Sequence, residues 1–261
     1  MTRGKLDRET ASKIEEELPE TLSLQKSALN FMPDFISMGF PVGSSVPIAA
    51  VCLQDTTRSL QEARYAVFEA HAHVIWYREK CESTDEFAAV FFGKFYADDA
   101  ALRLYAAGEH MANAIINMLD IRKDVSDFKK SALAIKKNVM SRQSLVGSYL
   151  VEHSPSHPIT KAIIKLKDSA EWKQTRKYRD DWVHNKPPII EGMGIDYERR
   201  NRLIVSDGSI GVSFGGGDEP QLSVDGLLAI ISPALRQLAE AAERTLEYYV
   251  DFLSKNQKTS W

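Results

Sequence analysis

The sequence predicts an all-α protein, an up-and-down helical bundle with one β-hairpin inserted before its last helix. Apolar residues recur at helical spacing through most of the chain. Only the region around Asp207-Gly208 combines short apolar segments with a hairpin turn. The composition, 44% hydrophobic and 26% charged, is typical of a globular domain and excludes a disordered or fibrous chain.

Residues 1–54 are predicted to form an N-terminal helical and irregular extension. The charge and periodicity of residues 7–30 indicate one or two helices, interrupted at Pro19. Residues 31–53 contain three prolines and two glycines, so we expect this stretch to be mostly irregular.

The main helical domain is predicted over residues 55–254. Its helices before the hairpin are expected at 55–81, 84–92, 96–119, 126–150 and 159–184. The helix at 96–119 has two apolar stripes, which indicates burial on most of its girth. Small residues on one stripe, such as Ala97, Ala101 and Gly108, permit a close neighbouring helix.

Pro187-Pro188 ends the last of these helices, because proline lacks the amide donor and restricts the residue before it. The inserted hairpin is expected at about 196–218, with strands at 202–205 and 210–214. A final helix is expected at about 224–254, kinked early by Pro233, and residues 255–261 form a tail.

Several classes of protein are disfavoured. No apolar run approaches the ~20 residues of a membrane span, and the first residues are charged, so we expect neither membrane insertion nor a signal peptide. Cys52 and Cys81 do not make a disulfide framework, which favours a cytoplasmic location. We expect no metal or cofactor, because C-x-x-C, H-E-x-x-H and a phosphate-binding loop are absent.

The charge is unevenly distributed although the net charge is only −3. Residues 122–202 hold eighteen Lys and Arg against ten Asp and Glu, so the middle of the chain is basic and the ends are acidic. Two interpretations stay open: ordinary solvated helix faces, or a basic surface that accepts phosphates.

One short motif carries most of the functional information, the segment R-D-D-W-V-H from Arg179 to His184. Asp180 and His184 are four residues apart and share a helix face, so a hydrogen bond between them would orient the imidazole. Arg179 and His184 lie about 140° apart around the axis. They can meet at one phosphate if the arginine folds back, if the helix end unwinds, or across a two-fold partner.

This segment resembles the R-x(4–6)-H motif of the HEPN superfamily, a group of helical bundles of which many cut RNA. Asp180 directly after the arginine, the position late in the chain before a long last helix, and the helical surroundings all fit. The resemblance covers about 55–254. It implies a homodimer in which two motifs meet, and a metal-independent endoribonuclease. His184 would then move protons, Arg179 would hold the phosphorane and Asp180 would orient or tune the pair.

Glu109 is a further candidate for this catalytic group. It interrupts an apolar stripe of the 96–119 helix, and a carboxylate on a buried face needs a cationic or hydrogen-bonding partner. One hypothesis is that Glu109 packs near Arg179 or His184. The alternative is that Glu109 lies at the solvent-exposed edge of the apolar stripe.

The leading functional hypothesis is an endoribonuclease that cleaves RNA by 2′-hydroxyl attack, in a toxin, defence or RNA-processing role, with an antitoxin or regulatory protein as a partner. The rival is a non-catalytic helical module for dimerisation or for nucleotide or RNA binding. A metal-using helical hydrolase is disfavoured by poor ligand spacing. Full burial of Arg179 and His184 within one subunit would favour the rival.

Overall fold

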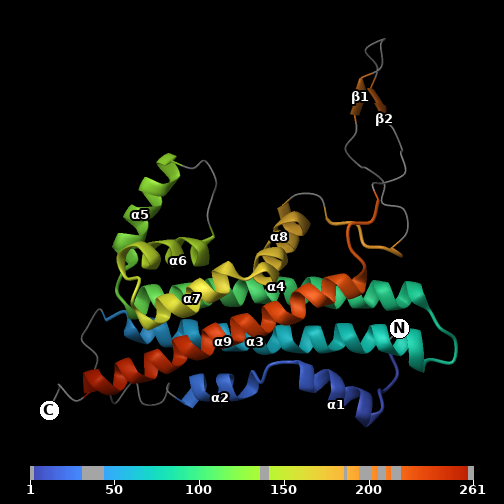
Figure 1. Cartoon of the computed structure of the whole chain (residues 1–261), viewed down its shortest axis with the longest axis horizontal. Helices are drawn as coiled ribbons and strands as arrows, with labels where there is room; N and C mark the ends of the chain where they lie inside the picture. The colour runs from blue at the N-terminus through green and yellow to red at the C-terminus, as the bar shows by residue number, and fades with distance from the viewer. Residues whose placement is uncertain are drawn as a thin grey trace.

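The protein is a bundle of α-helices, shown by a computed structural model (Figure 1). The structure describes residues 3–30, 44–135, 141–184, 187–193, 202–204, 210–212 and 219–257. Three long helices run side by side through the centre: α3 (Val46–Ile75), α4 (Glu86–Met118) and α9 (Val224–Gln257). The predicted all-α bundle is therefore confirmed.

The closest packing in the bundle joins α3 to α4. Both helices carry alanines that are fully or almost fully buried, among them Ala63 and Ala70 on α3 and Ala97 and Ala101 on α4. Small side chains let the two helix backbones approach. The small-residue stripe predicted for 96–119 thus has the close neighbour that it indicated.

Shorter helices cover this centre on two sides. The first two, α1 (Arg8–Glu17) and α2 (Leu22–Asn30), pack along α3 and contribute Ile14 and Leu24 to the same core. The others pack on α4 and α9 and are α5 (Arg122–Ile135), α6 (Arg142–His153), α7 (Pro158–Asp168) and α8 (Ala170–His184). The N-terminal segment therefore shares one core with the bundle.

The start of α3 corrects the expectation of an irregular stretch up to residue 53. The helix begins at Val46, so the boundary expected at residue 54 falls inside it. Pro47 did not prevent this, because proline in the first helical turn loses no intrahelical hydrogen bond. Residues 31–43 lie outside the described part of the chain.

The helix divisions downstream also differ from the expected ones. The segments 84–92 and 96–119 form one continuous helix, α4. The segment 126–150 is divided between α5 and α6, and 159–184 between α7 and α8. Serines explain two of the new starts: Ser141 is the N-cap of α6, and the Ser169 hydroxyl accepts the Trp172 amide at 3.0 Å in the first turn of α8.

Before α9, β1 (Arg202–Ile204) and β2 (Ile210–Val212) pair antiparallel, with Leu203 opposite Gly211. The Asp207-Gly208 turn lies outside the described residues. The helix α9 continues through Pro233. Within the described residues, no helix combines the length and apolar character needed to cross a bilayer.

Gly93 in α4 tests the close packing at the centre. A Cβ there would lie 2.7 Å from a methyl of Val74 on α3 and 2.8 Å from a methyl of Val224 on α9. Overpacking a core typically costs about 1–3 kcal/mol, and alanine recovers about 1 kcal/mol of helix propensity. We therefore expect Gly93→Ala to lower the free energy of unfolding by up to about 2 kcal/mol in urea denaturation. The control is Gly226→Ala in the first turn of α9, where the nearest atom is the movable Ser223 hydroxyl at 3.3 Å. An equal effect of both substitutions would contradict this account.

Candidate functional site

A line of polar side chains on α4 organises the candidate site. Its members are spaced by about one or two helical turns and therefore follow one side of the helix: Asp98, then Tyr105 seven residues later, then Glu109, Asn113 and Asn117 at steps of four. Each contacts or hydrogen-bonds a residue of α5, α6 or α8, as described below. The polar line therefore fixes where these three helices lie on the bundle.

The helix α8 is anchored to α4 by a buried tyrosine. The Tyr178 hydroxyl donates to Oδ1 of Asp98 at 2.5 Å, and Trp172 one and a half turns earlier is 2% exposed. Burial, with the nearby Asp98 carboxylate, raises the pKa of Tyr178 far above its usual range. The hydroxyl therefore stays protonated and can act as the donor.

Arg179 and His184 lie in contact at the C-terminal end of α8. The Arg179 guanidinium carbon lies 3.9 Å above the centre of the Tyr105 ring. Its Nη1 lies 3.3 Å from Nε2 of His184 and donates to Oδ1 of Asp180 at 2.9 Å. The Arg179 side chain is 16% exposed, and His184 is exposed. Arg179 and His184 therefore form a partly exposed cationic site that rests on the face of the Tyr105 ring.

The arginine folds back along its own helix to make this contact. Its long side chain spans the gap of about 140° around the axis, so the two groups meet without a second subunit. The expected hydrogen bond from Asp180 to His184 is not among those of the described residues. The Asp180 carboxylate accepts from Arg179 instead, since the guanidinium lies between the two groups.

The hydrogen bonds of Arg179 indicate which form of the His184 imidazole is present and which N–H groups of the guanidinium stay free. A guanidinium N–H can only donate, so the contact fits a neutral imidazole with its lone pair on Nε2. Both contacts of Arg179 use Nη1, its Nε is buried and closed to a ligand, and its Nη2 forms no hydrogen bond within the described residues. The guanidinium therefore keeps donor capacity for an arriving anion.

Glu109 has different partners from those hypothesised. Its carboxylate oxygens accept the backbone amides of Arg142 and Gln143 at 3.2 Å each, in the first turn of α6. None of its hydrogen bonds within the described chain goes to Arg179 or His184. A helix N-terminus can satisfy a half-buried carboxylate as well as a cation can. Burial is the main cause that raises the pKa of Tyr105, and the nearby Glu109 carboxylate raises it further. The Arg179 guanidinium lowers the pKa of Tyr105 and so opposes both.

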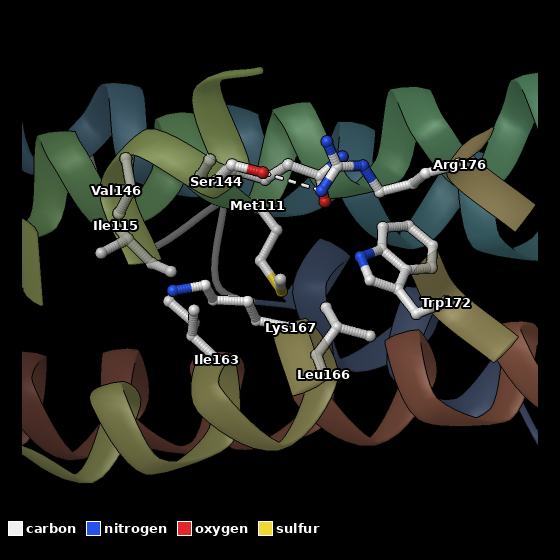
Figure 2. A pocket seen from close by; sticks show the side chains of 11 residues that line it. Met111, Ile115, Ser144, Val146, Ile163, Leu166, Lys167, Trp172 and Arg176 are labelled. Carbon is white, nitrogen blue, oxygen red and sulfur yellow. Dashed lines mark hydrogen bonds between the residues drawn. The ribbon is translucent and has the colours of Figure 1, made fainter. Parts of the chain in front are cut away.

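Arg176, which sequence reasoning missed, ties α8 to the start of α6. Its guanidinium donates to the hydroxyls of Ser144 at 2.7 Å and Ser141 at 2.9 Å, and Figure 2 shows it reaching across near Trp172. Nε of Arg176 and Nε2 of Gln143 have no protein partner, but both residues line a cavity of about 20 Å³, which has room for one water. The only sequence signal for Arg176 is its position one turn before Arg179.

Other combinations of chemically active residues are sparse. Within the residues that the structure describes, no three His, Cys, Asp or Glu side chains gather as metal ligands. His71 Nε2 lies 3.0 Å from the Ser232 hydroxyl in a separate cleft between α3 and α9. Burial lowers the pKa of His71, and nearby Glu17 and Asp225 oppose this shift. Cys52 and Cys81 are both free thiols.

Comparisons with protein-family models, with curated proteins and with solved structures give no match for this chain.

The ionisation of Tyr105 tests whether Arg179 and Glu109 both lie beside it. We expect Tyr105 to titrate above the ordinary tyrosine value of about 10 because it is desolvated. Removing the cation with Arg179→Gln should raise its pKa further, and removing the anion with Glu109→Gln should lower it. NMR of proteins with labelled tyrosine rings, with Tyr105→Phe assigning the signal, measures these shifts. A Tyr105 pKa that ignores both substitutions would contradict the geometry.

Proposed function

We propose that the protein is a metal-independent endoribonuclease of HEPN-like architecture, with Arg179 and His184 as its catalytic pair. The observation that carries the proposal is the 3.3 Å contact between the guanidinium and the imidazole at an exposed helix end. A cation beside a neutral histidine provides what cleavage of a phosphodiester needs: charge stabilisation and a proton acceptor.

In the proposed reaction the RNA supplies its own nucleophile. His184 takes the proton from the 2′-hydroxyl, whose oxygen attacks the adjacent phosphorus. The bond from phosphorus to the 5′-oxygen breaks, and that oxygen leaves with a proton. The products are a 2′,3′-cyclic phosphate and a 5′-hydroxyl. Arg179 donates to the phosphate oxygens as their negative charge grows.

The two neighbouring side chains have positioning roles in this proposal. Tyr105 packs against the guanidinium, and Asp180 holds its Nη1, so that Nη2 remains for substrate. When a phosphate arrives, the guanidinium turns its donors to the phosphate and frees Nε2 of His184. Glu109 acts indirectly, because its carboxylate holds the first turn of α6 in place.

The proposal includes a homodimer, because two motifs that face each other would supply a second histidine. That histidine, in its protonated form, gives its proton to the leaving 5′-oxygen. It also includes a cytoplasmic location, in keeping with the free thiols of Cys52 and Cys81. A toxin, defence or RNA-processing role and an antitoxin or regulatory partner belong to the same proposal.

The rival function is a non-catalytic module for dimerisation or for nucleotide or RNA binding. It would be favoured by a fully buried pair that is satisfied within one subunit. The exposure of His184 instead supports the catalytic proposal.

The direct test is the incubation of the purified protein with mixed RNA in EDTA. We expect cleavage, and a loss of about 100-fold or more in rate for both Arg179→Ala and His184→Ala, since each removes a group acting in the transition state. The control is Arg244→Ala on α9, whose guanidinium forms an exposed ion pair with Glu247. Circular dichroism checks that each variant is folded. Absence of cleavage of any RNA, or full activity of both variants, would end the proposal.

A further inference from the structure

A second cluster of cations lies next to the candidate site, in a cleft between α4, α5 and α6. The cleft has a volume of about 370 Å³. Its charged lining residues are Arg122 and Lys129 from α5, Arg142 from α6, and Glu109 from α4. Three cations therefore share one depression with a single carboxylate.

Neutral amides hold the two arginines of this cleft. The Arg142 guanidinium donates to the side-chain oxygen of Asn113, and Arg122 donates to that of Asn117 at 2.8 Å. Asn117 is 4% exposed and donates its own amide to the Asn113 carbonyl at 2.7 Å, so this support is fixed within the polar line of α4. An asparagine positions a guanidinium but leaves its positive charge unneutralised.

Several arginines elsewhere in the protein are neutralised by carboxylates. Arg3 pairs with Glu69, Arg78 with Glu86 and Asp225, and Arg103 with Glu62 and Asp99. Across the described ranges, Arg122, Lys129 and Arg142 form no ion pair with a carboxylate. Glu109, the acid in the cleft, is engaged by the amides of the first turn of α6. The cleft therefore keeps a net positive charge.

The cleft also lies at a useful distance from Arg179. Asn113, which holds Arg142, is eight residues beyond Tyr105 on the same face of α4, a rise of about 12 Å. Arg176, one turn before Arg179, donates to the hydroxyls of Ser141 and Ser144 on either side of Arg142, and within the described residues it has no carboxylate partner. A line of cations thus runs from the cleft to the candidate catalytic pair.

We infer that this cleft binds backbone phosphates of single-stranded RNA that flank the phosphate cleaved at Arg179 and His184. The choice of RNA as the ligand rests on the proposed function. The location of the binding site rests on the charges of the cleft. Guanidinium groups bind phosphate oxygens bidentately, and a track of such groups holds a strand without reading its bases. The enzyme therefore takes strands of several nucleotides and has little base preference in this cleft.

Binding can be measured separately from cleavage with a fluorescent single-stranded oligonucleotide that is 2′-O-methylated at every position. Such a strand keeps its phosphates but lacks the attacking hydroxyl. We expect Arg122→Gln, Arg142→Gln and Lys129→Gln each to weaken its binding severalfold in fluorescence anisotropy. Each should also reduce the steepness of the plot of log affinity against log salt by about 0.7, the value for one phosphate contact on a single strand.

The matched control is Arg103→Gln, an exposed arginine of α4 that is neutralised by Glu62 and Asp99. It should bind the strand like the native protein. Lys129→Gln provides a variant that breaks no hydrogen bond in the described structure, and thermal unfolding verifies that all four variants are folded. Native affinity and an unchanged salt dependence in the cleft variants would overturn the inference. Equal binding of polyglutamate with the same dependence on Arg122 and Arg142 would overturn the assignment to phosphates.

Cleavage distinguishes this inference from the function on which it rests. A dinucleotide has one phosphodiester bond and cannot reach the cleft, so the cleft variants should cleave it at the native rate but lose activity on longer RNA. If the native protein cleaves no RNA while the cleft variants still lose binding, the proposed reaction fails and the phosphate site stands. If the protein cleaves RNA and the cleft variants cleave RNA of every length at the native rate, the inference of a phosphate site fails and the proposed reaction stands.

Discussion

The structure depends on the way in which α4 is buried. Alanines on one part of its surface bring α3 within close reach, which places a long helix in the centre of the bundle. A helix in this position has few places for polar groups, and each one that it carries must be satisfied. Asp98, Tyr105, Glu109, Asn113 and Asn117 are satisfied by side chains and amides of α5, α6 and α8. These contacts join α4 to the three helices that carry the other candidate functional residues.

The polar line explains why the cations gather at one place. Three of its members, Glu109, Asn113 and Asn117, offer oxygens toward α5 and α6, and Tyr105 offers an aromatic face to α8. Arginines bind these groups because a planar guanidinium can donate to a carbonyl oxygen and can also stack on an aromatic ring. Within the described part of the chain, only Arg179 among Arg122, Arg142, Arg176 and Arg179 pairs with a carboxylate, so the surface remains positive in a chain with a net charge of −3.

The sequence predicted the architecture where periodicity was strong. The burial of 96–119 on most of its girth could be read from two apolar stripes, because a central helix has few exposed positions. Helix divisions were harder to predict, since a serine that starts a new helix, such as Ser169, also occurs within helices. Pro47 illustrates the opposite error, because the effect of proline depends on its place in the helix.

The candidate site was only partly accessible from the sequence. Arg179 and His184 were identified from their spacing, but the fold-back contact depends on Tyr105, which is 74 positions away from Arg179 in the chain. The basic character of residues 122–202 allowed two interpretations, and the structure contains examples of both. Lys165 and Lys177 form exposed ion pairs with Glu240 and Asp181, while Arg122 and Arg142 keep their charge in a cleft. Only the three-dimensional partners distinguish these cases.

The central claim is that the guanidinium of Arg179 and the imidazole of His184 act on one phosphate that is attacked by the neighbouring ribose hydroxyl. Mass spectrometry of the fragments from a defined RNA tests this claim most directly, because the chemistry of the new ends records the nucleophile. The account predicts a 2′,3′-cyclic phosphate on the upstream fragment and a 5′-hydroxyl on the downstream one. A 5′-phosphate on the downstream fragment would show that water attacked instead, and would contradict the account.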